Sequence, residues 1–376
     1  MRGLQIWAHS FCRSTLAFYG ALGDRLGVPF RICLARTGLG IRQQTGFDLE
    51  EFSNLELVEL DGSVANALLV LEARKDWNQL FGTYQTLSHV QAALAHAIKC
   101  KCRVAIASEA PCNMFQPSAK RLLKTIYLSS VAKRRFSHVF AGADFIINWS
   151  GDDAASLQEL GWRADKIIPL GYFPPPLKGS SFTRREGKSP SHFSILCTGN
   201  MTWHRGPDVL MNALALLKRW GIPAQATFTS EGPLQAPLKR MAEQHGIDCA
   251  FPGFVPMSKL IELYENCSVF VAPGRAEPWG MRVNDALHCG APIIISRGMG
   301  AHKLVNDCAV GVSFAAGDAV DLAWQIRRLA TDSDAYRRIN DNLADSRKVL
   351  MPEAAAERVA TVLPSFGPHW VPESAA

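Results

Sequence analysis

Two carboxylates on either side of an expected helix start are the first chemical signal in the sequence. Glu277 lies in a loop after the apolar run 269–272, which is short and β-branched enough for a buried strand. Asp285 falls in the first turns of the following helix, on the face opposite its apolar stripe, so packing does not require it. Both side chains can therefore bind hydroxyl groups.

The expected helix start between the two carboxylates can hold an anion. The N–H groups of Gly280, Met281 and Arg282 have no partner within the helix and point toward any anion bound there. An anion with hydroxyl-binding carboxylates on both sides suits a sugar joined to a nucleotide diphosphate. The alternative is structural: Glu277 is a solvated loop residue, and Asp285 complements the helix dipole.

The segment resembles a known motif. It reads Glu277-Pro278-Trp279-Gly280, then Asp285, then Cys289-Gly290-Ala291-Pro292. This resembles the E-x7-E region of glycosyltransferase family 4, usually written E-P-F-G, a second Glu, then C-G-x-P. The second carboxylate here is Asp, one methylene shorter. The resemblance implies that Glu277 holds sugar hydroxyls and that Asp285 holds the ribose hydroxyls.

A glycine turn after the expected strand 193–198 carries a second part of the resemblance. Gly199 and Asn200 open the turn, and Arg205 precedes a helix that starts at Pro207, a favourable first position. Family members usually carry two basic residues here that bind the diphosphate. Arg205 takes the place of the lysine and adds a bidentate fork, whereas Asn200 replaces an arginine and brings no charge.

Further segments of the second half complete the donor side that the resemblance implies. Ser230-Glu231-Gly232-Pro233 resembles the family's G-(D/E)-G-P turn, and Phe254-Val255 resembles the G-F-V segment that borders the nucleobase. The implied donor-binding residues are Gly199, Asn200, Arg205, Glu231, Phe254, Val255, Glu277, Trp279, Gly280, Met281, Arg282 and Asp285.

The acceptor side is expected in the first half of the chain. Ser108 and Glu109 follow the expected strand 104–107, and polar residues just past a parallel strand line the ligand crevice. Glu109 stands where many relatives carry a histidine; it can accept the acceptor's proton, or it can cap a turn. His9 and Arg13 follow the first strand, and each is either an acceptor contact or structural. We take Glu277, Glu109 and Arg205 as the candidate catalytic residues.

The elements that position these residues alternate between strand and helix. Expected strands at 4–8, 30–34, 55–60, 80–84, 104–107 and 143–148 enclose helices at 13–26 and 88–99. We expect an N-terminal acceptor domain at 1–172, a proline-rich linker at 173–192, and a C-terminal nucleotide-sugar domain at 193–350. The tail, 351–376, is expected to pack back toward the first domain. The fold class is α/β: two Rossmann-like, doubly wound domains facing each other across a cleft, the GT-B architecture of the family.

Composition restricts the function classes. The chain has 376 residues, 48% of them hydrophobic and 20% charged, with a net charge of +6, and this describes a globular protein that does not need a nucleic acid partner. Ten scattered cysteines form neither a zinc framework nor a secreted disulfide scaffold, so we expect the reducing cytosol. No stretch resembles a signal peptide or a membrane span.

The segment 118–136 is the one place that suggests a membrane. It carries six basic residues and no acidic one, and its apolar residues can share a helix face. It is either an amphipathic helix that rests on anionic lipid on the inner face of the membrane, or an ordinary helix with a hydrated basic face.

The resemblance implies a retaining, metal-independent glycosyltransferase. It would move a sugar from a nucleotide-diphosphate sugar to a saccharide or lipid-linked saccharide acceptor in surface polysaccharide biosynthesis. No cofactor and no metal ion are expected, because protein groups neutralise the diphosphate. Two alternatives stay open: an epimerase or phosphorylase on the same fold, and a non-catalytic sugar-nucleotide-binding partner of a polysaccharide assembly complex.

Overall fold

The computed structural model describes residues 1–8, 12–35, 55–82, 87–111, 123, 126–151, 154–182 and 193–372. The chain divides into two compact units. Residues 1–111, 122–175 and 351–376 belong to unit 1, and residues 176–350 belong to unit 2. Phe173 and Leu177, within the stretch expected as a linker, have buried side chains. The described residues include no helix long and apolar enough to cross a membrane.

Unit 1 is built on a parallel sheet whose described strands follow the order β3-β2-β1-β4-β5-β6-β7. The strands are β1 Leu4–Ala8, β2 Phe30–Leu34, β3 Leu55–Glu59, β4 Asn78–Phe81, β5 Val104–Ser108, β6 Phe145–Asn148 and β7 Ile167–Pro169. The helices of this unit are α1 Arg13–Leu26, α3 Val64–Glu72, α4 Ser88–Lys99, α6 Lys133–Arg135, α7 Ser137–Gly142, α8 Ala154–Leu160 and α16 Pro352–Val362. Strands β1, β2 and β4 are fully buried, as expected of a parallel sheet covered on both faces.

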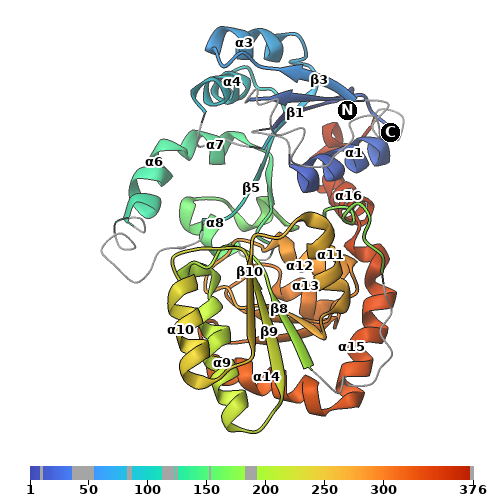
Figure 1. Ribbon diagram of the computed structural model, residues 1–376. Helices are drawn as coiled ribbons and strands as arrows, with labels where there is room; N and C mark the ends of the chain where they lie inside the picture. The colour runs from blue at the N-terminus through green and yellow to red at the C-terminus, as the bar shows by residue number, and fades with distance from the viewer. Residues whose placement is uncertain are drawn as a thin grey trace. The chain divides into compact units, whose positions relative to one another are not determined.

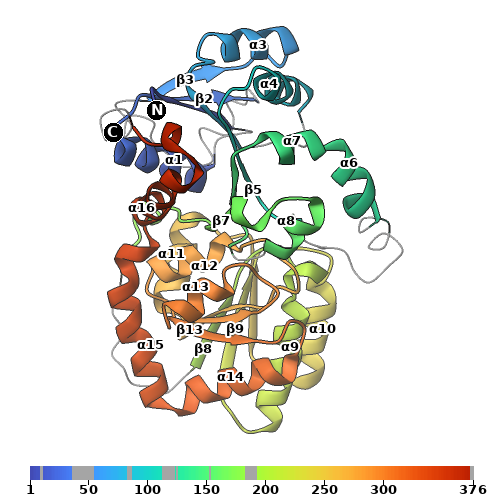
Figure 2. The ribbon, with the colours of Figure 1, turned by 180° about the vertical axis from the view of Figure 1, so that it is seen from behind.

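The C-terminal residues complete unit 1. Helix α16 packs along α1, and both helices lie side by side in the two views (Figures 1 and 2). Beyond α16, Trp370 lies against Phe145 of β6 at a centroid distance of 4.6 Å, and its Nε1 donates to Asp144 Oδ2 at 3.0 Å. The amino terminus is held there too, since its ammonium group donates to the carbonyl of Val371 at 2.6 Å. The last part of the chain is thus structurally part of the first unit.

Unit 2 is a second parallel sheet with the described order β10-β9-β8-β11-β12-β13. The strands are β8 Phe193–Cys197, β9 Ala224–Thr229, β10 Cys249–Gly253, β11 Val269–Ala272, β12 Ile293–Ser296 and β13 Gly311–Phe314. The helices are α9 Pro207–Arg219, α10 Gln235–His245, α11 Met257–Asn266, α12 Met281–His288, α13 His302–Asp307, α14 Ala319–Thr331 and α15 Ser333–Ser346. Alternating strands and helices in both units confirm the expected Rossmann-like α/β class.

Two local expectations differ from the structure. The strand expected at 80–84 is β4, Asn78–Phe81, and residues 83–86 lie outside the described part. The helix expected over 118–136 is not one regular α-helix where it is described: Tyr127–Ala132 form a π-helical turn, and α6 follows for three residues. Hydrophobic spacing alone cannot distinguish these two helix types, which differ by one residue per hydrogen-bonded ring.

Candidate functional site

The candidate site lies at the carboxyl edge of the unit 2 sheet, where two neighbouring strands end. Strands β8 and β11 pair in parallel, and the loops after them, 198–206 and 273–280, leave the sheet at the same edge. From β8 the sheet continues to β9 on one side and to β11 on the other. Such a reversal of strand order is where ligands bind in open α/β sheets.

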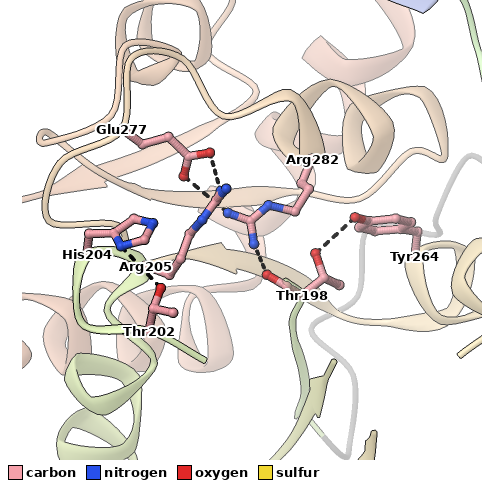
Figure 3. A network of polar contacts seen from close by, with 7 residues as sticks. All are labelled: Thr198, Thr202, His204, Arg205, Tyr264, Glu277 and Arg282. Carbon is pink, nitrogen blue, oxygen red and sulfur yellow. Dashed lines mark hydrogen bonds and ion pairs between the residues drawn. The ribbon is translucent and has the colours of Figure 1, made fainter. Parts of the chain in front are cut away.

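A cluster of two guanidinium groups and one carboxylate occupies this place (Figure 3). Arg205, from the loop after β8, pairs with Oε1 of Glu277, which comes from the loop after β11. Arg282, in the first turn of α12, donates from Nη2 to the other carboxylate oxygen, Oε2, at 3.1 Å. Its Nη1 donates to the carbonyl of Thr198, directly after β8. The three side chains therefore join three segments of the chain.

The cluster carries a net charge of +1. Two guanidinium groups share a single carboxylate, and the Glu277 side chain is only 11% exposed while those of Arg205 and Arg282 are 31% and 24% exposed. Burial, and next the charge of Arg282, lower the pKa of Arg205 despite its pairing with Glu277. Burial and the neighbouring Arg205 also lower the pKa of His204, which keeps this imidazole neutral at pH 7. Such a half-buried surplus of positive charge favours a bound anion.

A second ion pair fixes the two loops to each other. Arg275 donates from Nη1 and Nη2 to the carboxylate of Asp208 at 2.8 and 2.6 Å, and its Nη1 also reaches the carbonyl of Trp203 at 2.9 Å. Its guanidinium lies 5.2 Å from the Trp203 ring centroid, and its backbone N–H donates to the carbonyl of His204 at 2.8 Å. This bidentate pair holds the loops together independently of Glu277.

The backbone around Glu277 is held by the loop after β12. Its N–H donates to the carbonyl of Gly298 at 3.0 Å, and its carbonyl accepts from the N–H of Gly300 at 3.1 Å. The direction of the Glu277 side chain is therefore set by a neighbouring strand end and does not depend on the arginines alone.

Two glycines allow the close approach of the two loops. Gly199 has φ +97°, and a Cβ added there would lie 1.9 Å from Nη1 of Arg282. Gly206 has φ +69°, and a Cβ there would lie 2.1 Å from the carbonyl oxygen of Pro273. Any other residue would separate the loops or displace Arg282.

Tyr264 connects the surroundings of the cluster with Asp285. The hydroxyl groups of Thr198 and Tyr264 lie 3.1 Å apart, and Tyr264 is fully buried in α11. Burial and, next, the charge of Asp285 raise the pKa of Tyr264. Asp285 itself is half-buried on α12, eight positions after Glu277. Of the two carboxylates of the motif, Glu277 thus lies in the cluster before α12, and Asp285 lies within α12 near Tyr264.

The other candidate donor residues of unit 2 differ in exposure. Asn200 is exposed, and its Oδ1 accepts a hydrogen bond from Ser230 Oγ at 3.0 Å. Glu231, which follows Ser230 in the chain, is also exposed. Phe254 directly follows β10 and is 85% exposed, and Val255 is half-buried. These residues follow the ends of β8, β9 and β10, so they share the carboxyl edge with the cluster.

Trp279 does not offer its side chain to a ligand. Its side chain is 3% exposed and its Nε1 donates to Asn284 Oδ1 at 2.9 Å within the unit. The indole therefore supports the loop between Glu277 and the helix start.

The candidate acceptor residues belong to unit 1. Ser108 ends β5, and Glu109 follows it, with its Oε1 accepting a hydrogen bond from the hydroxyl of Tyr172 at 3.1 Å. The Tyr172 ring stacks on Trp149 at 5.2 Å, and burial, followed by the charge of Glu109, raises the pKa of the phenol. Arg13 is the first residue of α1. His9 lies outside the described residues.

Sequence reasoning missed the side chain of Arg282, for which only the backbone N–H was considered. It also missed His204 and the pair of Arg275 with Asp208. The available signal was positional, because Arg205 and Arg275 lie in the loops that follow two expected strands, 193–198 and 269–272. Which arginine meets which carboxylate depends on tertiary contacts over about 70 positions, which no local pattern contains.

Comparison with known proteins shows what this part of the chain resembles. Residues 181–345 match the family model of glycosyl transferases group 1. The match covers the whole candidate donor site. A GDP-mannose-dependent alpha-(1-6)-phosphatidylinositol dimannoside mannosyltransferase of Mycobacterium tuberculosis is 24% identical over 202 residues, 53% of this chain and 52% of the relative. A D-inositol 3-phosphate glycosyltransferase of Streptomyces bingchenggensis is 24% identical over 72% of this chain and 60% of its own.

Two solved structures share the fold. The Anabaena protein Alr3699/HepE, in complex with UDP and glucose, has a TM-score of 0.66 at 14% identity over 97% of this chain and 100% of its own. Sucrose-phosphate synthase of Thermosynechococcus elongatus has a TM-score of 0.65 at 16% identity, covering 97% and 99%. The chain spans about half the length of the first curated relatives that it matches. These similarities show the fold class expected from the sequence, with two Rossmann-like units.

Proposed function

We propose that the chain is a retaining glycosyltransferase of family 4 that uses a nucleotide-diphosphate sugar as donor. One observation carries the proposal: two guanidinium groups share one carboxylate in a half-buried cluster at the point where the strand order of unit 2 reverses. A diphosphate brings the negative charge that this cluster lacks. The family match over 181–345 and the nucleotide ligands of the structural neighbours support the same donor class.

In this proposal Arg205 and Arg282 bind the diphosphate and stabilise its charge as it leaves the sugar. Binding draws the arginines away from Glu277, whose carboxylate is then free to accept hydrogen bonds from sugar hydroxyls. Asp285 takes the ribose hydroxyls, and Phe254 with Val255 borders the base. Holding donor groups at several fixed points lowers the entropy cost of reaching the oxocarbenium-like state.

Metal independence is part of the proposal, because the two guanidinium groups supply positive charge of the kind that a divalent cation supplies in metal-dependent enzymes. It is tested by turnover after removal of divalent ions with a chelator. Unchanged turnover is expected, and recovery only on adding back magnesium or manganese would overturn this part.

We assign the acceptor, a saccharide or lipid-linked saccharide of surface polysaccharide biosynthesis, to unit 1. Glu109 is the candidate base there, because its carboxylate follows β5 and already accepts a hydrogen bond from Tyr172. The lipid-linked class is suggested by the Mycobacterium tuberculosis relative, whose name gives a phosphatidylinositol dimannoside. Glu109→Gln is expected to lower transfer at least a hundredfold while leaving donor binding unchanged.

Peripheral contact with anionic lipid also belongs to the proposal. Ile126, Tyr127 and Val131 are 51%, 44% and 53% exposed, and the exposed side chains of Lys133, Arg134 and Arg135 follow them. Apolar side chains beside a basic run suit the interface of an anionic bilayer. Co-sedimentation with phosphatidylglycerol vesicles, and its loss when the three basic residues are changed to Gln, tests this part.

The central experiment is a thermal-shift screen with nucleoside diphosphates and sugar nucleotides, followed by hydrolysis assays on every stabilising donor. We expect stabilisation of wild type and of Arg240→Ala, which removes an exposed arginine of α10, and loss of stabilisation in Arg282→Ala. No stabilisation of wild type by any nucleotide would overturn the proposal. Binding without turnover, even with lipid-linked acceptors, would favour the alternative of a non-catalytic sugar-nucleotide-binding partner.

A further inference from the structure

Three different potential metal ligands meet on the surface of unit 1. Glu72 is the last residue of α3, His96 lies in the last turn of α4, and Cys100 is the C-cap of α4. Nε2 of His96 lies 2.8 Å from Oε1 of Glu72 and 3.4 Å from Sγ of Cys100. The three ligand atoms all lie within 4.8 Å of one another.

These distances fit one tetrahedral ion. Zinc binds imidazole nitrogen at about 2.0 to 2.1 Å and thiolate sulfur at about 2.3 Å, so two such ligands of a tetrahedral ion lie roughly 3.5 Å apart. The separation of His96 Nε2 from Cys100 Sγ, 3.4 Å, is close to that edge. The Glu72 oxygen has to move outward by about half an ångström, since it now shares a hydrogen bond with the same nitrogen.

The scaffold that presents the ligands is already formed. His96 and Cys100 are four positions apart, which places both side chains on the same side of α4. The helix ends in a Schellman motif: the N–H of Lys101 donates to Ile98 at 3.0 Å, and that of Cys102 to Ala97 at 2.9 Å. Lys101 holds the left-handed conformation, φ +57°, that this motif needs, which fixes Cys100 just before it.

Helices α3 and α4 are also fixed against each other. They lie side by side in both views (Figures 1 and 2), and Ala67, Leu71, Ala93 and Ala97 pack in one buried cluster. Both helices end at the ligand cluster, so the negative ends of their dipoles point at it. A cation placed there is stabilised by both helix ends as well as by its ligands.

We propose that Glu72, His96 and Cys100 form a zinc site that links the ends of α3 and α4, with water in the fourth position. Imidazole, thiolate and carboxylate together suit zinc better than magnesium or calcium, which prefer oxygen ligands. Both helices connect parallel strands, so their ends lie at the amino edge of the unit 1 sheet, whereas Ser108 and Glu109 follow its carboxyl edge. The site is therefore structural and separate from sugar transfer.

Lys75 competes with zinc for Glu72, and this gives a sharp test. Lys75 Nζ pairs with Oε2 of Glu72 at 2.9 Å, and its side chain is 61% exposed. Removing this ammonium group leaves the carboxylate without its nearest cation. Lys75→Met is therefore expected to tighten zinc binding several-fold, which a variant that merely damages the fold does not do.

The experiment is a zinc titration of the full chain against a chromophoric chelator, in a reductant that does not bind metal. We expect at least a tenfold loss of affinity for Glu72→Gln, His96→Gln and Cys100→Ser, because each removes a direct ligand. His138→Gln, an exposed histidine of the same unit, is the matched control and is expected to bind as wild type does. Melting of each metal-free variant verifies that it is folded.

Cobalt substitution gives a second readout. A thiolate-to-cobalt charge-transfer band is expected in wild type, weakened in Cys100→Ser and kept in Cys308→Ser, which removes a half-buried cysteine of unit 2. The proposal is overturned if the three ligand variants bind zinc as tightly as wild type, or if Lys75→Met and Cys100→Ser leave affinity and absorption unchanged.

Discussion

Replacing Glu277 by Gln separates the binding of the diphosphate from the turnover of the donor. The substitution keeps the size of the side chain but removes the carboxylate that Arg205 and Arg282 share. The charge of the cluster then rises from +1 to +2. Because a bound diphosphate no longer has a carboxylate beside it, a bare nucleoside diphosphate is expected to bind more tightly, while transfer from a sugar nucleotide is lost.

The size of the effect follows from Coulomb's law. A phosphate oxygen bound to the free edge of either guanidinium lies roughly 5 to 6 Å from the Glu277 carboxylate, where two unit charges repel by about 3 kcal/mol at an effective dielectric constant of about 20. The arginines are 31% and 24% exposed, so solvent and salt reduce this repulsion. About 1 to 2 kcal/mol remains, which corresponds to roughly 5- to 30-fold tighter binding.

The assay is isothermal titration of the nucleoside diphosphate that stabilises wild type, at two salt concentrations, together with donor turnover. Glu262→Gln is the matched control: it removes one carboxylate from an exposed pair on α11 and changes the net charge equally. Binding that weakens in Glu277→Gln, or that tightens to the same degree in Glu262→Gln, refutes the reasoning from a local charge surplus. Turnover that survives in Glu277→Gln removes its role at the sugar.

Three further predictions concern the cluster, its pH dependence and the fold. Gly199→Ala is expected to displace Arg282 and to weaken diphosphate binding at least tenfold in a titration, because its Cβ meets the guanidinium at 1.9 Å. The lowered pKa of His204 means that the unfolded chain binds more protons just below pH 6.5, so stability falls on acidification there; denaturant unfolding of His204→Gln is expected to show a smaller loss. Trp370→Ala removes a buried ring from Phe145 and is expected to cost about 3 to 5 kcal/mol in the unfolding of unit 1, followed by fluorescence.

The class of fold was predictable because local signals agree with it. The helix expected at 13–26 is α1, Arg13–Leu26, and it ends where Gly27 takes the left-handed conformation, φ +63°. The short β-branched run 269–272, expected as a buried strand, is β11, and all four of its residues are buried. Each of these features depends on a few adjacent residues, so the sequence alone contains the information.

The side chains that form the cluster were less predictable, because their contacts join residues far apart in the sequence. The sequence motif identifies Glu277 and Arg205 as candidates. The contact of the Arg282 side chain with the loop after β8 depends on the pairing of β8 with β11, which the motif does not contain. Trp279 was assigned to the donor side by its position in the motif, whereas its burial, with 3% of the residue exposed, depends on packing that the motif does not contain. Motifs indicate which segments gather at a strand edge, whereas packing determines which side chains face the ligand.

The two ion pairs between the loops differ in what a ligand can replace. Arg275 binds Asp208 through both carboxylate oxygens and stacks on Trp203, contacts that tie the loop after β11 to the loop after β8 and to α9. Arg205, in contrast, reaches Glu277 with one nitrogen, Nη1, and Arg282 reaches it with Nη2. A diphosphate can therefore displace the carboxylate of Glu277 while the bidentate pair keeps the loops in place. Exchange of a ligand at the cluster then requires the movement of side chains and no refolding of the loops, which suits the proposed binding and release of a nucleotide.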